Sequence, residues 1–412
     1  MKKQRKRTSV SPVSHDTDAT FVEKNGRTYY TSRNGKLRPN QWLFSFTMDI
    51  RDDVDGSRTG GLTGLIWLIS LHDVPNTVIP VFLSTRSWAT KSALMSALFS
   101  ERSMPTLSVQ GDAGLYNLFL DWKYSQFKAT NAGRKQSIAC LGLQDDFRTV
   151  VLSPEVIYYI GEDGARRIQY PNSQYVWVPG CELPEKVVPY TGPEEPPFLL
   201  TLRRLLPKST FYTFLFMLAH SLVSIKYCAL ITDLFGIPSV VVVGRPDSWK
   251  TTLANLTLSF FGRELHTLCN VRQISLPALR ERWQKLRLPH IFHDVADIPT
   301  LREVILASFE QQLHVNYRTV DEPAQPTSSV LITANAGNAE ELVQSGTDRE
   351  RLTSRIVFLQ IDEPVTDWDF SDAQAFQRGK AFAATYAELL LGLLSPDSLN
   401  GFLATVYATQ KT

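Results

Sequence analysis

The stretch VVVGRPDSWKTTLANLTLSFFG, residues 241–262, sets the first expectation for the fold of this chain. A run of β-branched valines ends at Gly244, a short polar loop follows, and a helix-compatible segment begins near Lys250. The loop keeps the spacing of the phosphate-binding pattern GxxxxGK(S/T), except that Trp249 stands where the second glycine is expected. A strand before such a loop and a helix after it are the context that this pattern requires, so the sequence predicts a phosphate-binding strand–loop–helix.

The chemistry of such a loop assigns a role to each of its residues. Successive backbone N–H groups turn inward around the β-phosphate, Lys250 reaches the β/γ oxygens and Thr251 holds magnesium. Trp249 still supplies its amide but lacks the conformational freedom of glycine, so its indole must point away from the phosphates. ATP and Mg²⁺ are the expected ligands, and the expected binding residues are Gly244, Ser248, Trp249, Lys250, Thr251 and Thr252. The alternative is an ordinary strand–turn–helix without a ligand.

A second acidic strand is expected downstream, in residues 289–297. Its apolar residues lead to Asp294, which we predict to be a magnesium ligand together with Thr251. A water-activating glutamate usually follows such an aspartate, but Val295 follows here, and Asp297 or Glu303 could polarise the water instead. The segment could also merely cap a strand.

A third strand, within SSVLITANAGN at residues 328–338, ends in polar residues. A polar side chain at a strand end next to the γ-phosphate can orient the attacking water. Asn335 is therefore the candidate sensor of the γ-phosphate.

Three arginines surround the segment before a fourth strand, in DRERLTSRIVFLQID at residues 348–362. An exposed guanidinium there could reach a neighbouring subunit's γ-phosphate as an arginine finger. Arg355 is the first choice and Arg351 the second. A surface ion pair with Asp348 or Glu350 is the alternative.

Taken in this order, GRPDSWKTT, IFHDVAD, VLITAN and RLTSRIVFLQI resemble the AAA+ core of superfamily 3 helicases and of helicase-like ATPases associated with phage, plasmid and mobile-element primases. The resemblance covers residues 197–365. It implies phosphate contact for Lys250, a magnesium ligand in Asp294, γ-phosphate sensing by Asn335 and stimulation in trans by Arg355, which together form the expected catalytic set. It also implies a homo-oligomer, expected to be a hexameric ring.

In that family a hairpin before the sensor strand tracks single-stranded DNA, and the matching stretch here is QQLHVNYRTVDEPAQPTSS. Its candidates for nucleic-acid contact are His314, Tyr317 and Arg318. A basic residue beside an aromatic one suits contact with a phosphate and a stacked base. A solvated loop without a partner is the alternative.

The expected fold class is α/β, with a C-terminal AAA+ P-loop core preceded by a strand-rich α+β domain. The expected boundaries are a disordered basic tail at 1–20, the N-terminal domain at 21–188, a linker at 189–196, the core at 197–365 and a helical segment at 366–412. The N-terminal domain could recognise DNA or a replication protein. A hairpin is expected to close at Glu162-Asp163-Gly164.

Composition excludes some classes of protein. The 412 residues carry 43 basic and 41 acidic side chains, so whole-molecule charge points to no polyanionic partner. Its 4 cysteines are scattered and no secretory signal is expected, which favours a cytoplasmic location, or a nuclear one in a eukaryotic host. The most apolar run is interrupted by His220 and Lys226, so we expect a buried helix and no membrane span.

The sequence thus predicts an ATP-dependent, DNA-acting helicase-like AAA+ ATPase in replication or mobilisation of a virus or mobile genetic element. The alternative is a nucleotide-binding assembly or regulatory protein with weak or no hydrolysis, which Trp249 and Val295 favour. A third possibility is a structural shell in which the indole fills the phosphate pocket.

Overall fold

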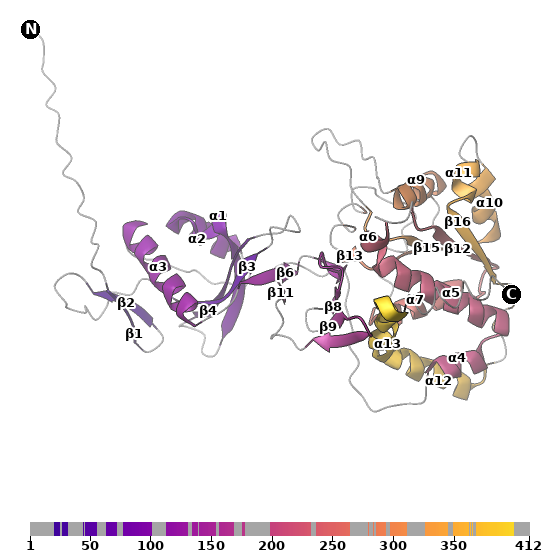
Figure 1. Cartoon of the computed structure of the whole chain (residues 1–412), viewed down its shortest axis with the longest axis horizontal. Helices are drawn as coiled ribbons and strands as arrows, with labels where there is room; N and C mark the ends of the chain where they lie inside the picture. Colours follow the sequence, from indigo (N-terminus) through magenta and orange to yellow (C-terminus); the bar gives the residue numbers. More distant parts are fainter. Residues whose placement is uncertain are drawn as a thin grey trace, which may run out of the picture. The chain divides into compact units, whose positions relative to one another are not determined.

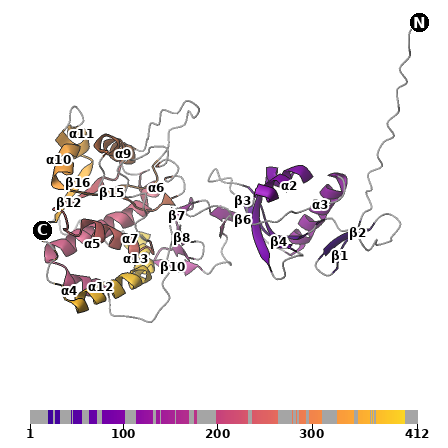
Figure 2. The same ribbon diagram turned by 180° about the vertical axis from the view of Figure 1, so that it is seen from behind.

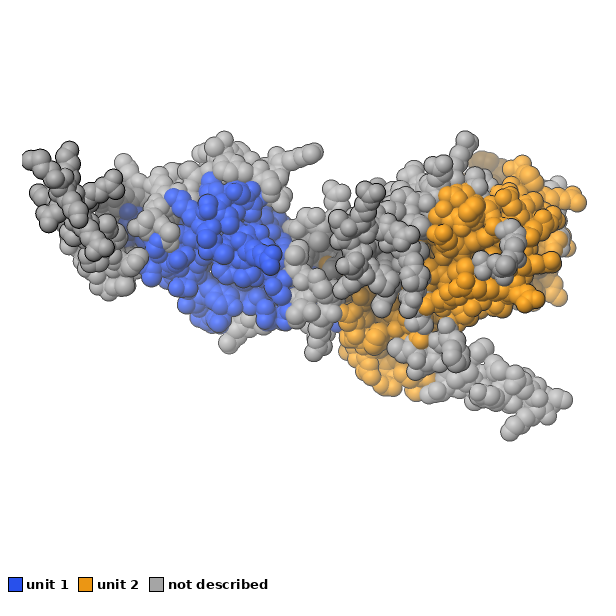
Figure 3. All heavy atoms as spheres, turned by 90° about the horizontal axis from the view of Figure 1, so that it is seen from above, with its two compact units in different colours: residues 1–137, 174–181 blue, residues 138–173, 182–412 orange. Residues whose placement is uncertain are grey.

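A computed structural model describes residues 20–24, 27–31, 44, 46–55, 63–71, 77–100, 113–130, 134–138, 140–153, 156–168, 175–177, 198–231, 236–263, 279, 283, 286–293, 297–310, 326–344, 349–361, 363, 365 and 368–398. The chain forms two compact units, coloured separately in Figure 3. Unit 1 comprises residues 1–137 and 174–181, and unit 2 comprises residues 138–173 and 182–412. The expected tail, apart from Thr20, and the expected linker lie outside the described residues.

Unit 1 is an α+β module, as the sequence predicts. Its elements are β1 (Thr20–Lys24), β2 (Arg27–Thr31), β3 (Phe46–Asp55), β4 (Gly64–Leu71), β5 (Val78–Ser84), α1 (Thr85–Trp88), α2 (Lys91–Ser100), α3 (Ala113–Ala129), β6 (Lys135–Ile138) and β11 (Tyr175–Trp177). Five of the strands form a sheet in the order β11-β6-β3-β4-β5. Strand β3 alternates buried and more exposed residues, the period of a strand with one face on a core. That core includes Met48, Trp67 and Phe119.

Unit 2 contains the residues that resemble a nucleotide-binding core. Its elements are β7 (Leu141–Leu143), β8 (Thr149–Ser153), β9 (Val156–Ile160), β10 (Ala165–Ile168), α4 (Phe198–Leu205), α5 (Lys208–Ile225), α6 (Tyr227–Leu230), β12 (Ser239–Gly244), α7 (Lys250–Ser259), β13 (Leu286–Arg287), β14 (His290–His293), α9 (Ile298–Glu310), β15 (Val330–Ala334), α10 (Ala336–Gln344), α11 (Arg349–Thr353), β16 (Ile356–Ile361), α12 (Phe370–Phe382), η3 (Ala383–Tyr386) and α13 (Ala387–Gly392).

A four-stranded parallel sheet in the order β14-β15-β12-β16 organises unit 2. Helices α5 and α7 cover one face of it and α9, α10 and α11 the other (Figures 1 and 2). Strand β12 has a parallel neighbour on each side, which explains its continuous run of valines: a strand covered on both faces has no polar side.

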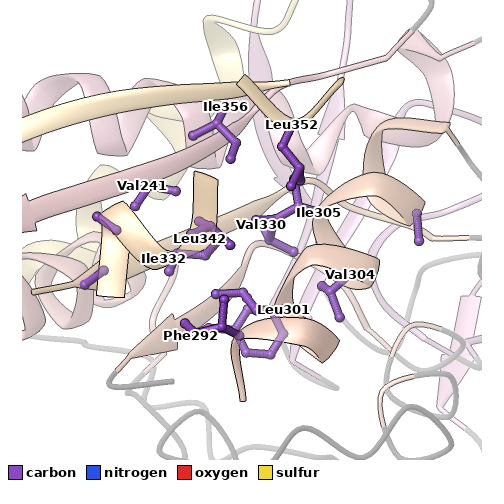
Figure 4. Close-up of a cluster of buried hydrophobic side chains, with 14 of the residues drawn as sticks. Val241, Phe292, Leu301, Val304, Ile305, Val330, Ile332, Leu342, Leu352 and Ile356 are labelled. Atoms are coloured by element: carbon purple, nitrogen blue, oxygen red, sulfur yellow. The ribbon is translucent and has the colours of Figure 1, made fainter. Parts of the chain in front are cut away.

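The core between the sheet and helices α9–α11 is shown in Figure 4. Val241 and Ile332 from the central strands, Phe292 from β14 and Ile356 from β16 are buried there with Leu301 of α9. Apolar burial of this extent fixes the register of the strands, because a slip of one residue would turn these side chains to the other face. The carboxyl ends of the strands are thereby held in fixed positions.

The division of the chain differs from the boundary expected at residue 188. Residues 138–173 group with unit 2, where strand β7 pairs in parallel with β13 and completes a sheet in the order β10-β9-β8-β7-β13. The pairing joins segments more than a hundred residues apart, and no local sequence pattern predicts it. The expected hairpin is confirmed: the Gly161 amide donates to the Gly164 carbonyl, 2.7 Å apart, between antiparallel β9 and β10.

The apolar run expected as a buried helix forms α5, and its inner face is buried. Its outer face leaves Tyr212, Phe216 and Val223 exposed, so the helix is buried on one side. Among the described residues, no helix has the length and apolar character that crossing a bilayer requires. The expected C-terminal helical segment is represented by α12, η3 and α13.

Candidate nucleotide-binding site

The loop after β12 begins with a close approach of three parts of the chain. Gly244 ends the strand and is buried, and a Cβ atom added to it would lie 2.6 Å from Ser248 Oγ and 2.9 Å from the Ile361 carbonyl oxygen. Both distances are below van der Waals contact, so only glycine fits. The loop therefore folds back tightly on the strand end.

Trp249 has the backbone conformation that the pattern reserves for glycine. Its φ and ψ are 65° and 7°, in the left-handed region, at the N-cap of α7. A side chain in that conformation costs roughly 1–2 kcal/mol. Asp247 also has a positive φ, of 60°. The loop thus adopts this turn with a tryptophan in place of glycine, at a cost in backbone strain. The Trp249 amide lies at the N-cap of α7.

Lys250 is buried and points back into the loop. Its ammonium nitrogen donates to the carbonyl oxygens of Gly244 and Arg245, at 2.9 and 2.5 Å, and lies 3.3 Å from Ser248 Oγ. All three oxygens belong to the loop itself, so a phosphate oxygen would have to replace at least one of them. The first turn of α7 adds N–H groups that have no intrahelical acceptor.

The indole of Trp249 packs against aromatic residues of the C-terminal segment. Its ring lies 4.4 Å from that of Trp368 and 5.5 Å from that of Phe376, both edge to face. The contacts of the indole with α12 do not favour the third possibility above, in which this ring fills the phosphate pocket. Thr251 and Thr252 are exposed in the first turn of α7.

Asn335 lies at the same edge of the sheet as the loop. Strands β12 and β15 are parallel and Val243 pairs with Ala334, so Gly244 and Asn335 both follow the last pair of this ladder. Asn335 is half-buried, and its carbonyl oxygen accepts from the Ala339 amide as α10 begins. The register thus brings together two of the residues that the sequence analysis singled out. Ligands of open parallel sheets bind at this edge.

The expected magnesium ligand Asp294 and its neighbour Val295 lie outside the described residues. Strand β14 ends at His293, which pairs with Thr333, so the chain leaves β14 near the same edge. Among the described residues, no three His, Cys, Asp or Glu side chains are grouped to hold a metal. The assignment of Asp294 stays a prediction.

The two candidates for polarising water have different surroundings. Asp297 caps α9: its carboxylate accepts from the Thr300 amide at 3.2 Å and its carbonyl from the Leu301 amide at 3.0 Å. A carboxylate used in this way stabilises the helix start. Glu303 is exposed on α9.

The candidate arginine fingers form ion pairs with a residue that the sequence analysis missed, Glu310 at the end of α9. Arg351 binds the carboxylate of Glu310 through two nitrogens, with Nε 2.9 Å from Oε1. Arg355 Nη2 lies 3.2 Å from the same oxygen, and its guanidinium stacks over Phe309 with the carbon 4.9 Å from the ring centre. The alternative expected from the sequence was an ion pair with Asp348 or Glu350, whereas the ion pairs in the structure are with Glu310, and the arginine-finger role stays a prediction.

Glu310 and the anchors Trp368 and Phe376 could not be found by spacing, because each meets its partner from a distant part of the chain. One signal was present for the aromatic pair: a tryptophan in a loop that needs glycine requires an apolar place for its ring. The nucleic-acid candidates His314, Tyr317 and Arg318 lie outside the described residues.

The geometry defines a mixed α/β fold with a strand–loop–helix at the carboxyl edge of a parallel sheet. A solved structure has a similar fold. The structure titled "SCCmec type IV Cch - active helicase" matches with a TM-score of 0.51 over 89% of this chain at 13% identity, so the two share a fold. This chain spans 64% of that protein.

The structure titled "The A form apo structure of NrS-1 C terminal region-CTR" covers 79% of this chain and 64% of its own at 14% identity, but its TM-score of 0.34 is too low to support an argument. No protein-family model matches the sequence, and no curated protein does either.

Proposed function

We propose that this chain is a helicase-like AAA+ ATPase that binds ATP in the loop of residues 244–252 and acts on DNA in replication or mobilisation of a virus or mobile genetic element. The observation that carries the proposal is the loop itself. Trp249 takes the strained turn that the phosphate-binding pattern demands, and Lys250 lies inside it among oxygens. The fold shared with an active helicase supports a DNA-acting role.

Different residues of the chain would bind different parts of ATP and the attacking water. Lys250 would exchange its contacts with the Gly244 and Arg245 carbonyls for oxygens of the β- and γ-phosphates, and the N–H groups of the first turn of α7 would bind the β-phosphate. Asn335, at the same edge, would hold the attacking water in line with the γ-phosphate. Magnesium, when bound by Thr251 and Asp294, would neutralise charge on the phosphates.

The arginines would act between subunits of a ring. Charge that develops on the γ-phosphate would be stabilised by Arg355, or by Arg351, from the next copy. The ring is expected to be hexameric, and single-stranded DNA would bind through His314, Tyr317 and Arg318 in its channel.

A second candidate is a nucleotide-binding regulatory or assembly protein with slow or no turnover. The strained backbone of Trp249 in the loop favours this candidate. Val295 favours it too, because it stands where a glutamate that activates water is expected. Phosphate release from ATP, with and without a single-stranded DNA oligonucleotide, separates the two. The ATPase is supported if DNA stimulates release and Lys250→Ala abolishes it, whereas full ATP affinity without release supports the regulatory protein.

A further inference from the structure

An aromatic cluster links the phosphate loop to the C-terminal helix α12. Trp249, Trp368 and Phe376 contact one another in all three combinations, with ring centres 4.4, 5.5 and 5.1 Å apart. Two of the three pairs are edge to face, a favourable arrangement of aromatic rings. The Trp249 ring, whose backbone is strained, thus packs against the other two rings of the cluster.

The two partners of Trp249 are themselves held in place. The indole N–H of Trp368 donates to the Leu205 carbonyl at the end of α4, 3.0 Å away. The residue after it, Asp369, caps α12 by accepting from the Asp372 amide at 2.8 Å. The position of Trp368 is thus fixed from both sides.

Phe376 is the more deeply buried partner. It is 3% exposed and packs edge to face on Phe198 of α4. One turn along α12, Gly379 allows the helix to lie directly on Phe198, because a Cβ there would lie 1.9 Å from the ring. Helix α12 therefore presents Phe376 to the loop from a rigid base, and Trp368 lies just before the start of the same helix.

We propose that Trp368 and Phe376 are positioning residues that hold Trp249 in its left-handed conformation and so set the nucleotide affinity of the loop. The inference rests on the proposed function. A glycine takes this conformation at little cost, whereas Trp249 needs the favourable packing of its ring to offset the strain. Without that packing, Trp249 relaxes toward the right-handed region, and the amides of residues 249–251 no longer converge on a phosphate.

The inference predicts a dependence between two positions that a purely structural role of Trp368 does not. In the natural background, Trp368→Ala weakens ATP binding about three- to tenfold, as expected when the ring contact between Trp368 and Trp249 is lost. In a Trp249→Gly background the loop no longer needs its anchor, so adding Trp368→Ala changes the affinity by less than twofold. Trp368→Phe, which keeps a ring, restores most of the affinity in the natural background.

The test measures ATP dissociation constants with Mg²⁺ by calorimetry for the natural protein, both single variants and the double variant. Phe370→Ala is the matched control, since Phe370 begins the same helix but is 84% exposed, and it leaves the affinity unchanged. Equal weakening by Trp368→Ala in both backgrounds, or none in either, overturns the inference. Lack of binding by the natural protein overturns the proposed function with it, whereas binding without dependence between the two positions overturns this inference alone.

Discussion

Arg355 and Lys250 lie at opposite ends of the same parallel sheet. Strand β16 runs beside β12 in parallel. The Arg355 carbonyl accepts from the amide of Ser239, the first residue of β12. The loop that leads to Lys250 begins after Gly244, the last residue of β12. Five residue steps along a strand span about 17 Å. The guanidinium of Arg355 therefore lies far from the loop of its own chain, and under the proposed function it would act on the loop of another copy.

The first prediction concerns this separation. Arg355→Ala lowers phosphate release by about 10³-fold or more, as expected for a residue that stabilises transition-state charge, while ATP affinity changes by less than threefold. Lys250→Ala has intact arginines but no functional loop. Mixed in equal amounts, the two variants regain part of the phosphate release, because a natural loop can then meet a natural arginine.

Arg351→Ala mixed with Lys250→Ala is the matched comparison, since Arg351 shares the Glu310 partner and is the second candidate. Recovery in neither mixture, with oligomers shown to form by light scattering, contradicts action between subunits.

A second prediction tests the ion pairs of Glu310. The Glu310 side chain is 33% exposed, and those of its partners Arg351 and Arg355 are 45% and 20% exposed. Pairs exposed to this extent contribute about 1 kcal/mol or less, so Glu310→Gln lowers the free energy of unfolding in urea by no more than that. The difference should shrink at 1 M salt, where such charges are screened. A reduction several times larger, unaffected by salt, would show that the pairs carry part of the fold.

A third prediction follows from a buried histidine. His220 Nε2 lies 3.0 Å from the Pro238 carbonyl and 3.1 Å from Ser329 Oγ, and burial lowers the pKa of His220 from 6.5 to about 4. Between these values the unfolded chain binds the proton and the folded one does not. Stability from the neutral ring is therefore complete above pH 6.5 and is lost as pH falls toward 4, by about 2 kcal/mol at pH 5.

His220→Gln removes this titration. Urea unfolding at several pH values should show a shallower fall between pH 6.5 and 4 in the variant than in the natural protein. Parallel curves for the two proteins would mean that other groups account for the pH dependence.

A fourth prediction uses two helical glycines. At Gly379 of α12 a new Cβ would overlap the buried Phe198 ring, so Gly379→Ala should lower the free energy of unfolding by about 1–3 kcal/mol. At Gly337 of α10 nothing lies within 4 Å, and Gly337→Ala should be neutral or stabilise by up to about 1 kcal/mol. The two substitutions add the same atom, so equal effects would contradict the packing of α12 on α4.

Local patterns predicted the elements of this fold well. The run of valines indicated β12, and the alternation of β3 and the turn at Glu162-Asp163-Gly164 each had a local chemical signal. The pairing of β7 with β13 had none, because it depends on contacts between distant segments, and the two compact units divide the chain differently from the boundary expected at residue 188.

The candidate site divides in the same way. Gly244, Lys250 and Asn335 could be singled out by spacing along the chain, and the register of β12 and β15 brings the loop and Asn335 to one edge. The role of Trp368 depends on a contact 119 residues from Trp249, and that of Glu310 on contacts 41 residues from Arg351. Such partners are set by how helices pack, which spacing does not encode.

The central claim is that residues 244–252 bind a nucleoside triphosphate in spite of Trp249. Calorimetric titration of ATP with Mg²⁺ into the natural protein and into Lys250→Ala tests it most directly. The account predicts saturable binding of one ATP per chain that is lost, or weakened at least a hundredfold, when the Lys250 ammonium is removed. No heat and no thermal protection at saturating ATP, or equal binding by the two proteins, would contradict it.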